Sequence, residues 1–152
     1  MPVTLQPIDK DNWRQAIKLK LTEDQKGFVA PNWYSIIECL YEDSPYAYSM
    51  AIMADDVMVG YSLFGYFSDD PPGECWIGRL MIDSDHQGKG YGRAALMAIL
   101  AHLKAANQCG QIFLSVEPEN TIARALYESA GFVSTGRIEH DELVYEYTGD
   151  QG

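Results

Sequence analysis

A glycine-rich segment carries the strongest chemical signal in the sequence: His86-Gln87-Gly88-Lys89-Gly90-Tyr91-Gly92-Arg93. It follows an apolar stretch expected to form a strand and precedes a stretch with helical spacing. Glycines there let backbone N–H groups approach a ligand without an intervening Cβ, and the start of a helix adds unpaired donors and positive dipole charge. Lys89 and Arg93 add positive side chains to an otherwise acidic chain. The pattern predicts a cradle for a phosphate or diphosphate.

The two common nucleotide-binding motifs do not fit this segment. A P-loop requires GxxxxGK[ST], and no such run exists in the sequence. A dinucleotide motif, G-x-G-x-x-G, could begin at Gly88 and Gly90, but its third glycine position is Arg93. The acidic residue expected further along is also missing from residues 107–113, NQCGQIF. A strand-to-helix turn without any ligand remains the alternative.

The spacing Gln87-x-x-Gly90-x-Gly92 resembles the diphosphate-binding motif, Q/R-x-x-G-x-G/A, of the GNAT superfamily of acetyl-CoA-dependent N-acetyltransferases. A second segment, residues 119–132 (ENTIARALYESAGF), resembles the N-x-x-A-x-x-L-Y-x-x-x-G-F helix of the same family. The stretches 80–83 and 113–116 are similar to the family's two central strands. Two motifs in the family order carry a resemblance that covers nearly the whole chain.

The resemblance implies a splayed sheet that holds acetyl-CoA, the co-substrate, between two central parallel strands. The strand would pair with the pantetheine arm through its backbone, and the glycine-rich turn would hold the diphosphate through its N–H groups. Asn120 is similar to the family residue near the pantetheine or substrate end, and simple N-capping is an equal alternative for it. The predicted cofactor-binding residues are Leu80, Met81, Ile82, Gln87, Gly88, Lys89, Gly90, Tyr91, Gly92, Arg93 and Asn120.

The resemblance also implies direct acetyl transfer to an amine in a ternary complex. Tyr127 matches the motif position of a general acid, since a phenol can protonate the departing thiolate; the alternative is a core aromatic residue. The family often places a basic carboxylate in the middle of the strand before the glycine-rich turn, but this chain has Gly78 there. Glu74 is the nearest upstream carboxylate and the candidate base. Proton loss through water to bulk solvent is the rival.

The N-terminal segment indicates a cationic acceptor. Carboxylates and aromatic faces suit an ammonium group, and the predicted acceptor residues are Glu23, Glu38, Trp33 and Tyr34. Residues 19–32, 34–36 and 76–83 resemble bacterial spermine/spermidine acetyltransferases, which implies a polyamine or diamine as the small-molecule substrate. Two alternatives stay open: another amine, such as a protein N-terminus, a lysine or an amine-bearing drug, or a non-catalytic acyl-CoA-binding sensor.

Hydrophobic periodicity predicts the elements that must position these residues. The expected order is β-α-α-β-β-β-α-β-α-β-β, a mixed sheet in an α+β (α/β layered) architecture. Residues 1–148 form one domain and residues 149–152 a tail. Asp11 is the expected cap of the first helix, Gly110 the expected stop of the third. Trp33, Ile36, Ile37, Leu40 and Tyr41 are expected to form a buried stripe on the second helix.

Composition and net charge limit the classes of partner that we expect the chain to bind. The chain has 152 residues and a formal net charge of -11, which disfavours nucleic acid as a partner. Three widely separated cysteines, Cys39, Cys75 and Cys109, indicate neither a zinc site nor a disulfide framework, and no metal is expected. With no signal sequence or long apolar run, the expectation is a cytoplasmic protein without a membrane partner. The final strand, Leu143 to Tyr147, is expected to offer an exposed edge for a possible homodimer.

Overall fold

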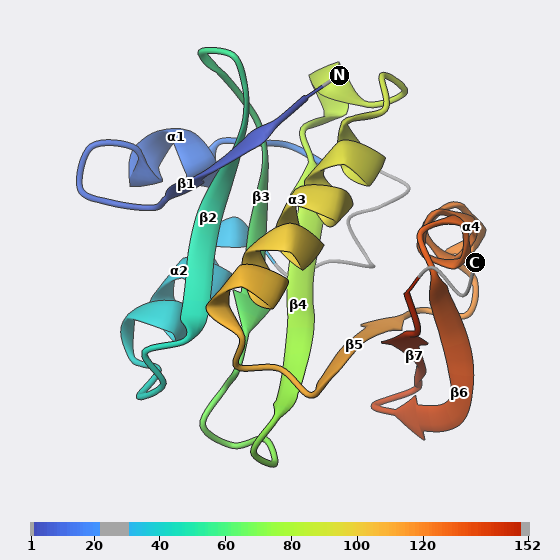
Figure 1. Ribbon diagram of the computed structural model, residues 1–152. Helices are drawn as coiled ribbons and strands as arrows, with labels where there is room; N and C mark the ends of the chain where they lie inside the picture. The colour runs from blue at the N-terminus through green and yellow to red at the C-terminus, as the bar shows by residue number, and fades with distance from the viewer. Residues whose placement is uncertain (1, 22–30, 150–152) are drawn as a thin grey trace.

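A seven-stranded sheet flanked by helices on both faces forms the body of the protein (Figure 1). The computed structural model describes residues 2–21 and 31–149. The observed element order confirms the predicted one: β1 (Thr4–Pro7), α1 (Trp13–Ile17), α2 (Asn32–Leu40), β2 (Ala47–Ala54), β3 (Val57–Gly65), β4 (Glu74–Ile82), the 3-10 turn η2 (Ser84–His86), α3 (Tyr91–Ala106), β5 (Gln111–Val116), α4 (Thr121–Ser129), β6 (Phe132–Glu139) and β7 (Glu142–Tyr147).

The strands lie in the order β1-β2-β3-β4-β5-β7-β6. Only the central pair, β4 and β5, is parallel, and the other pairs are antiparallel. The sheet is therefore mixed, as expected for an α+β fold. The expected dimer edge is wrong, because β7 lies between β5 and β6 and pairs with both. The strand at that edge is β6.

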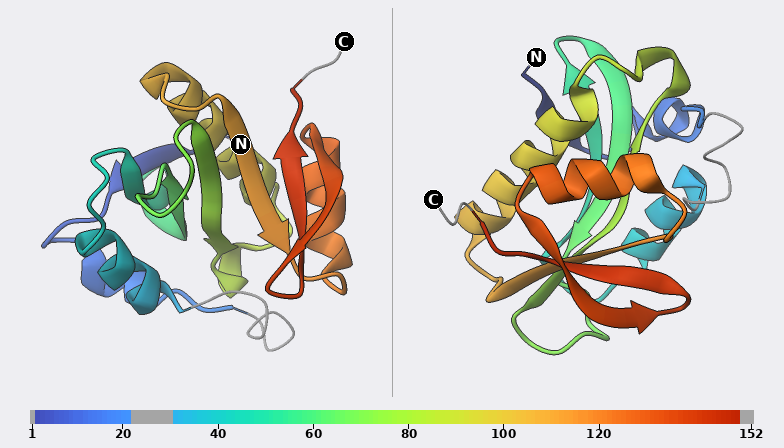
Figure 2. Two further views of the ribbon diagram at one scale, coloured as in Figure 1. Left: turned by 90° about the horizontal axis from the view of Figure 1, so that it is seen from below. Right: turned by 90° about the vertical axis from the view of Figure 1, so that its right-hand side faces the viewer.

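The helices cover opposite faces of the sheet, with α3 on one face and α1 and α2 on the other (Figure 2). The predicted buried stripe of α3 is confirmed, since Leu96, Ile99, Leu100 and Leu103 are at most 1% exposed. These residues pack with Phe64, Ile77, Leu114, Phe132 and other buried side chains in the largest core cluster. On the other face, Ala16 of α1 and Ile36 of α2 pack against Tyr61, Leu63 and Met81. No helix among the described residues has the length and apolarity needed to span a bilayer.

The predicted buried stripe of α2 is wrong. Ile36 is buried, but Ile37, Leu40 and Tyr41 are 49%, 73% and 84% exposed. The helix faces the sheet instead through Asn32, Ser35 and Ile36. The Asn32 amide donates a hydrogen bond to the Ala16 carbonyl of α1 at 2.9 Å, so a polar contact fixes the orientation that apolar spacing alone did not reveal.

Two helix ends also differ from the expectation. Asp9, rather than Asp11, accepts hydrogen bonds before α1, from the N–H groups of Asp11 and Asn12 at 2.8 and 3.1 Å. At the end of α3, Asn107 adopts the left-handed conformation (φ 55°) three residues before Gly110. Asparagine tolerates this conformation better than most residues, so it can end a helix as glycine does.

A disulfide joins Cys75 to Cys109, and the expectation of three unpaired cysteines is therefore wrong. The two residues are 34 positions apart in the sequence, which suggested no pairing. Cys75 lies opposite Ile112 in the parallel β4–β5 pair, so the turn that leads into β5 brings Cys109 beside it. Their Cα atoms are 5.5 Å apart, within the range that a disulfide requires. Cys39 remains a free thiol.

Candidate active site

β4 and β5 separate halfway along their length. They pair only where residues 74–77 lie opposite residues 111–114. The separation begins at Gly78, which has no partner in β3, because Leu63 pairs with Arg79 and Phe64 with Ile77. Such a β-bulge bends a strand and increases its twist. The predicted splay of the sheet is therefore observed, and it leaves the β5-facing backbone of Arg79 to Ile82 without a neighbouring strand.

A cavity of about 740 Å³ fills the space between the separated strands. Its walls come from β4, the glycine-rich turn, the end of β5, α4 and the start of β7. The lining residues include Gly78, Arg79, Leu80, Met81, Ile82, His86, Gln87, Gly88, Gly90, Tyr91, Gly92, Ser115, Val116, Glu117, Asn120, Tyr127 and Glu142. The structure thus brings both sequence motifs to one cavity.

The glycine-rich turn has the backbone that its sequence predicts. Gly88 and Gly90 have φ values of +77° and +85°, and an added Cβ at either position would meet no atom within 4 Å. Residues with side chains rarely adopt such angles, so glycine is needed here for conformation and leaves open space beside the backbone. Gln87 anchors the turn, because its Nε2 donates to the Ile82 carbonyl at 2.9 Å.

Two predicted cofactor-binding residues do not line the cavity. Lys89 is exposed at the tip of the turn. Arg93 points toward α4 and donates from Nη1 to Ser129 Oγ at 2.9 Å. Their positive charges lie near the glycine-rich turn, but the backbone of that turn, not these side chains, forms the cavity wall.

Helix α4 presents Asn120 and Tyr127 to the cavity. Asn120 Oδ1 accepts a hydrogen bond from the Ala123 N–H at 3.3 Å, which confirms the predicted N-cap. The helix is tied to β7 through the Tyr145 hydroxyl, which accepts from Arg124 Nε at 3.2 Å and donates to Glu128 Oε2 at 2.7 Å. These contacts fix the rotation of α4 and thereby the direction of Tyr127.

The environment of Tyr127 keeps its hydroxyl protonated. Burial, together with the negative charge of Glu142, raises the pKa of Tyr127 to about 12. Both effects disfavour the phenolate. The side chain also packs edge-on against Phe132, with ring centroids 6.1 Å apart. At neutral pH the cavity therefore contains a fixed, protonated phenol.

The acetyltransferase (GNAT) family profile matches residues 10–132 of the chain. The chain belongs to the GNAT acetyltransferase family. The spermine/spermidine N(1)-acetyltransferase of Bacillus subtilis (strain 168) is 27% identical over 145 residues, covering 91% of this chain and 93% of the relative. The N-alpha-acetyltransferase RimI of Mycobacterium tuberculosis is 30% identical over 93 residues, covering 61% of this chain and 56% of the relative.

A solved structure shares the fold over nearly the whole length of this acetyltransferase. The spermidine N-acetyltransferase from Vibrio cholerae, in complex with CoA and spermine, superposes with a TM-score of 0.73 at 17% identity. The match covers 95% of this chain and 92% of that one. The chain is an N-acetyltransferase of the GNAT type, as the sequence resemblance implied.

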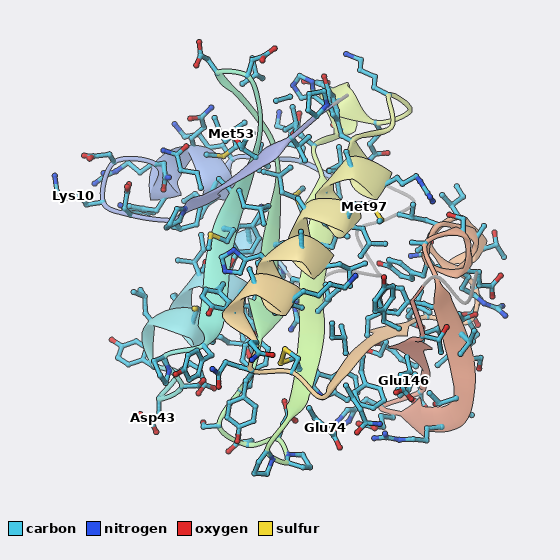
Figure 3. The ribbon with its side chains drawn as sticks, viewed as in Figure 1. Lys10, Asp43, Met53, Glu74, Met97 and Glu146 are labelled. Carbon is cyan, nitrogen blue, oxygen red and sulfur yellow. A yellow bond between two sulfur atoms is a disulfide. The ribbon has the colours of Figure 1, made fainter. Side chains whose placement is uncertain are left out.

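The predicted base and acceptor residues of the acetyltransferase do not gather in the cavity. Glu74 begins β4 and lies at the opposite end from the glycine-rich turn (Figure 3). Five residues of extended strand, about 16 Å, separate it from Arg79. Trp33 and Tyr34 are exposed on α2, and Glu23 lies outside the described residues.

Glu38 reaches the cavity only indirectly. Its Oε1 lies 3.5 Å from Nη2 of Arg79, which lines the cavity. Glu42, an acidic residue two positions beyond the end of α2, has a structural contact instead: its Oε2 accepts from the Ser44 and Ser68 N–H groups at 2.8 and 3.0 Å. These two carboxylates are therefore already in contact with protein groups.

Sequence reasoning missed three polar residues of the cavity, namely Ser115, Glu117 and Glu142. Ser115 and Glu117 lie at the end of β5, next to a recognised motif, and could have been found from that position. Glu142 could not, because it comes from β7, and only the insertion of β7 between β5 and β6 brings it beside Ser115.

Proposed function

We propose that this acetyltransferase transfers the acetyl group of acetyl-CoA to a primary amine of a polyamine or diamine. One observation supports it above the others: a single cavity is lined by the open glycine-rich turn, by the protonated phenol of Tyr127 and by two carboxylate residues, Glu117 and Glu142. The turn suits an anionic cofactor, and the carboxylates suit a cationic acceptor.

Acetyl-CoA fits the residues that are present. The backbone at Gly88 and Gly90 lies beside open space, so a diphosphate can approach the N–H groups of the turn and of the first turn of α3. The free edge of β4 at Leu80 and Met81 can hydrogen-bond an extended arm as an added strand would. When bound, the cofactor supplies a thioester as the acetyl donor.

Tyr127 is the proposed general acid of the reaction. It lines the same cavity as the turn, and its hydroxyl is protonated at neutral pH, so it can donate a proton to the sulfur that leaves. Because α4 is held to β7 through Tyr145, the hydroxyl is positioned before substrate binds. Asn120, at the N-terminus of the same helix, caps α4 and lines the cavity at once.

The polyamine preference rests on charge and on the named relatives. Glu117 and Glu142 give the cavity two carboxylates to receive ammonium groups, and the chain as a whole carries a net charge of -11. The Bacillus subtilis relative of similar length is a spermine/spermidine N(1)-acetyltransferase.

An acceptor panel tests the proposal. Purified protein is assayed with acetyl-CoA against spermine, spermidine, putrescine, an aminoglycoside, free amino acids and a peptide with a free N-terminus, and acetylated products are identified by mass spectrometry. We expect the highest kcat/KM with a polyamine. Absence of turnover with every polyamine, while another amine is acetylated, would overturn the polyamine assignment and leave the transferase activity in place.

Arg79 favours a second candidate acceptor. Arg79 is one of the residues that line the cavity, although Glu38 Oε1 lies 3.5 Å from its Nη2. A cation there suits an acceptor with a carboxylate near its amine, such as an amino acid or a short peptide. In the panel, this candidate predicts that the peptide or an amino acid exceeds spermidine, and that Arg79→Gln lowers that preference.

A further inference from the structure

The carboxylate of Glu142 is held in the cavity in a defined position. Ser115 Oγ donates to Glu142 Oε1 at 2.6 Å, across the β5–β7 pair. Among the described residues, none donates to Oε2, and the side chain lines the cavity. One oxygen is therefore engaged by the protein, and the other is available to a ligand.

The tight turn between β6 and β7 fixes where this carboxylate lies. His140 and Asp141 form its two-residue turn, both with positive φ (53° and 66°). Such tight turns set the register of a hairpin, and Glu142 follows directly, opposite Glu139 of β6. The carboxylate is thus presented by a strand that pairs on both sides, rather than by a loop.

Glu142 also lies near the proposed acid. Its negative charge acts on Tyr127, a residue of α4 that lines the same cavity. A carboxylate and a protonated phenol in one cavity can serve as a base and an acid with separate duties. Glu74, the carboxylate expected to act as base, lies at the far end of β4 and outside the cavity.

We propose that Glu142, positioned by Ser115, receives the ammonium group of the acceptor and removes its proton. The inference rests on the proposed acetyl transfer but not on which amine is the acceptor. A β7 residue thereby takes the role of base, because the middle of β4 has Gly78, at the bulge, in place of a carboxylate.

The proton balance is complete without any further reactant. The acceptor R–NH₃⁺ gives one proton to the Glu142 carboxylate, which leaves a neutral amine and a carboxylic acid. The amine nitrogen forms a C–N bond with the acetyl carbon, and the C–S bond breaks. The nitrogen loses its second proton to solvent, and the thiolate gains one from Tyr127. The Tyr127 phenolate then takes a proton back from solvent, so these transfers cancel. Glu142 then releases its proton to solvent.

The test compares Glu142→Gln with Glu146→Gln. Glu146 lies on the same strand, outside the cavity, and accepts a hydrogen bond from Gln111. With whichever amine the wild-type protein acetylates best, we expect Glu142→Gln to lower kcat by about 100-fold or more, with an unchanged Kd for CoA by calorimetry. We expect Glu146→Gln to keep wild-type values.

A second measurement needs neither acceptor nor cofactor. Glu142 raises the pKa of Tyr127, so Glu142→Gln should lower that pKa in an ultraviolet titration. Subtracting the titration of Tyr127→Phe isolates this tyrosine from the others. Glu146→Gln should leave the Tyr127 pKa unchanged.

Each outcome decides the proposal. A kcat within about threefold of wild type, or a loss confined to the acceptor KM, overturns proton removal by Glu142. If Glu142→Gln does not fold or bind CoA, Ser115→Ala decides instead. It keeps the carboxylate but frees it, so a kcat about tenfold lower supports the proposal and an unchanged kcat overturns it. Failure of every polyamine in the panel affects only the acceptor assignment.

Discussion

The two ends of β4 serve opposite purposes. At the start of the strand, the Cys75–Cys109 disulfide closes the space to β5, and the rings of Trp76 and Phe113 stack with centroids 5.2 Å apart. The carbonyl of Gly73 accepts hydrogen bonds from the N–H groups of Gly110 and Gln111 at 2.8 and 3.0 Å. This end is fastened by covalent, aromatic and backbone contacts.

The other end of β4 is open. Beyond the bulge at Gly78, the strand leaves β5 and lines the cavity with the glycine-rich turn. A backbone that must bind a ligand has to remain unpaired within the protein, and an unpaired edge contributes little to stability. The contrast indicates that the fastened end holds β4 and β5 at a fixed separation, while the open end leaves a backbone edge and a cavity for ligand binding and catalysis. Changes at one end should therefore leave the property of the other intact.

Tyr127→Phe should have the largest effect, on the open end alone. We expect kcat to fall by about 10²–10⁴-fold, because the variant lacks the acid that protonates the leaving sulfur. The ring and its contact with Phe132 remain, so the Kd for CoA and the melting temperature should not change. Since the pKa of Tyr127 is raised to about 12, this residue should cause no alkaline fall of kcat up to pH 10. A kcat near the wild-type value would contradict the assignment.

Cys109→Ser should have the second-largest effect, a loss of stability at the fastened end. The disulfide closes a 34-residue separation, and a crosslink of that length stabilises by about 4 kcal/mol in the chain-entropy treatment. We expect a loss of that size in denaturant unfolding, with kcat/KM nearly unchanged below the melting temperature. Cys39→Ser is the control, since Cys39 is a free thiol. A large loss of kcat without a stability loss would show that the two ends are coupled.

Gly90→Val should act on cofactor binding at the open end. Valine at a φ of +85° forces the turn to shift, and its methyl groups enter the space beside the N–H groups. Loss of one or two charge-assisted hydrogen bonds corresponds to a Kd for CoA about 10–100-fold weaker by calorimetry. Gly136→Val is the matched control, because Gly136 has a φ of +82° and equally open surroundings on β6. Equal effects of both variants would mean that strain, not ligand contact, is measured.

The same contrast explains what the sequence could predict. The backbone of the glycine-rich turn, the buried stripe of α3 and the Asn120 cap each arise from contiguous residues whose local chemistry determines their conformation. All three are observed in the structure. The Cys75–Cys109 bond and the Ser115–Glu142 contact join residues 34 and 27 positions apart. They depend on which strand enters the sheet beside which, and no local pattern encodes that.

The prediction of the buried side of α2 was wrong for a related reason. The apolar spacing correctly predicts a helix, but it does not show which side of the helix faces the sheet when a polar residue can occupy that side. Asn32 occupies that side with a hydrogen bond to Ala16. Glu38, the acidic residue of α2 that was assigned to an acceptor, does not line the cavity. The carboxylates of the cavity come instead from Glu117, which follows β5, and from Glu142 of β7.

Glu42→Gln should give the smallest effect, at the fastened end. Partial burial opposes ionisation of Glu42, but hydrogen bonds from Ser44 and Ser68 prevail and lower its pKa. Ser68 belongs to the loop between β3 and β4, so the carboxylate ties α2 to the fastened end. We expect the variant to lose about 0.5–1 kcal/mol at pH 7, a value reduced by solvent exposure.

The pH dependence of that loss identifies its cause. A carboxyl group with a lowered folded-state pKa stabilises the fold above the unfolded value of about 4.3, and this contribution disappears as the pH falls through the folded-state pKa. The difference in unfolding free energy between the wild-type protein and Glu42→Gln should therefore be full at pH 7 and shrink below about pH 4. Asp43→Asn is the control, as the neighbouring Asp43 is exposed. A difference that is independent of pH would assign the effect to packing, and the charge of Glu42 would then have no part in fastening α2 to the β3–β4 loop.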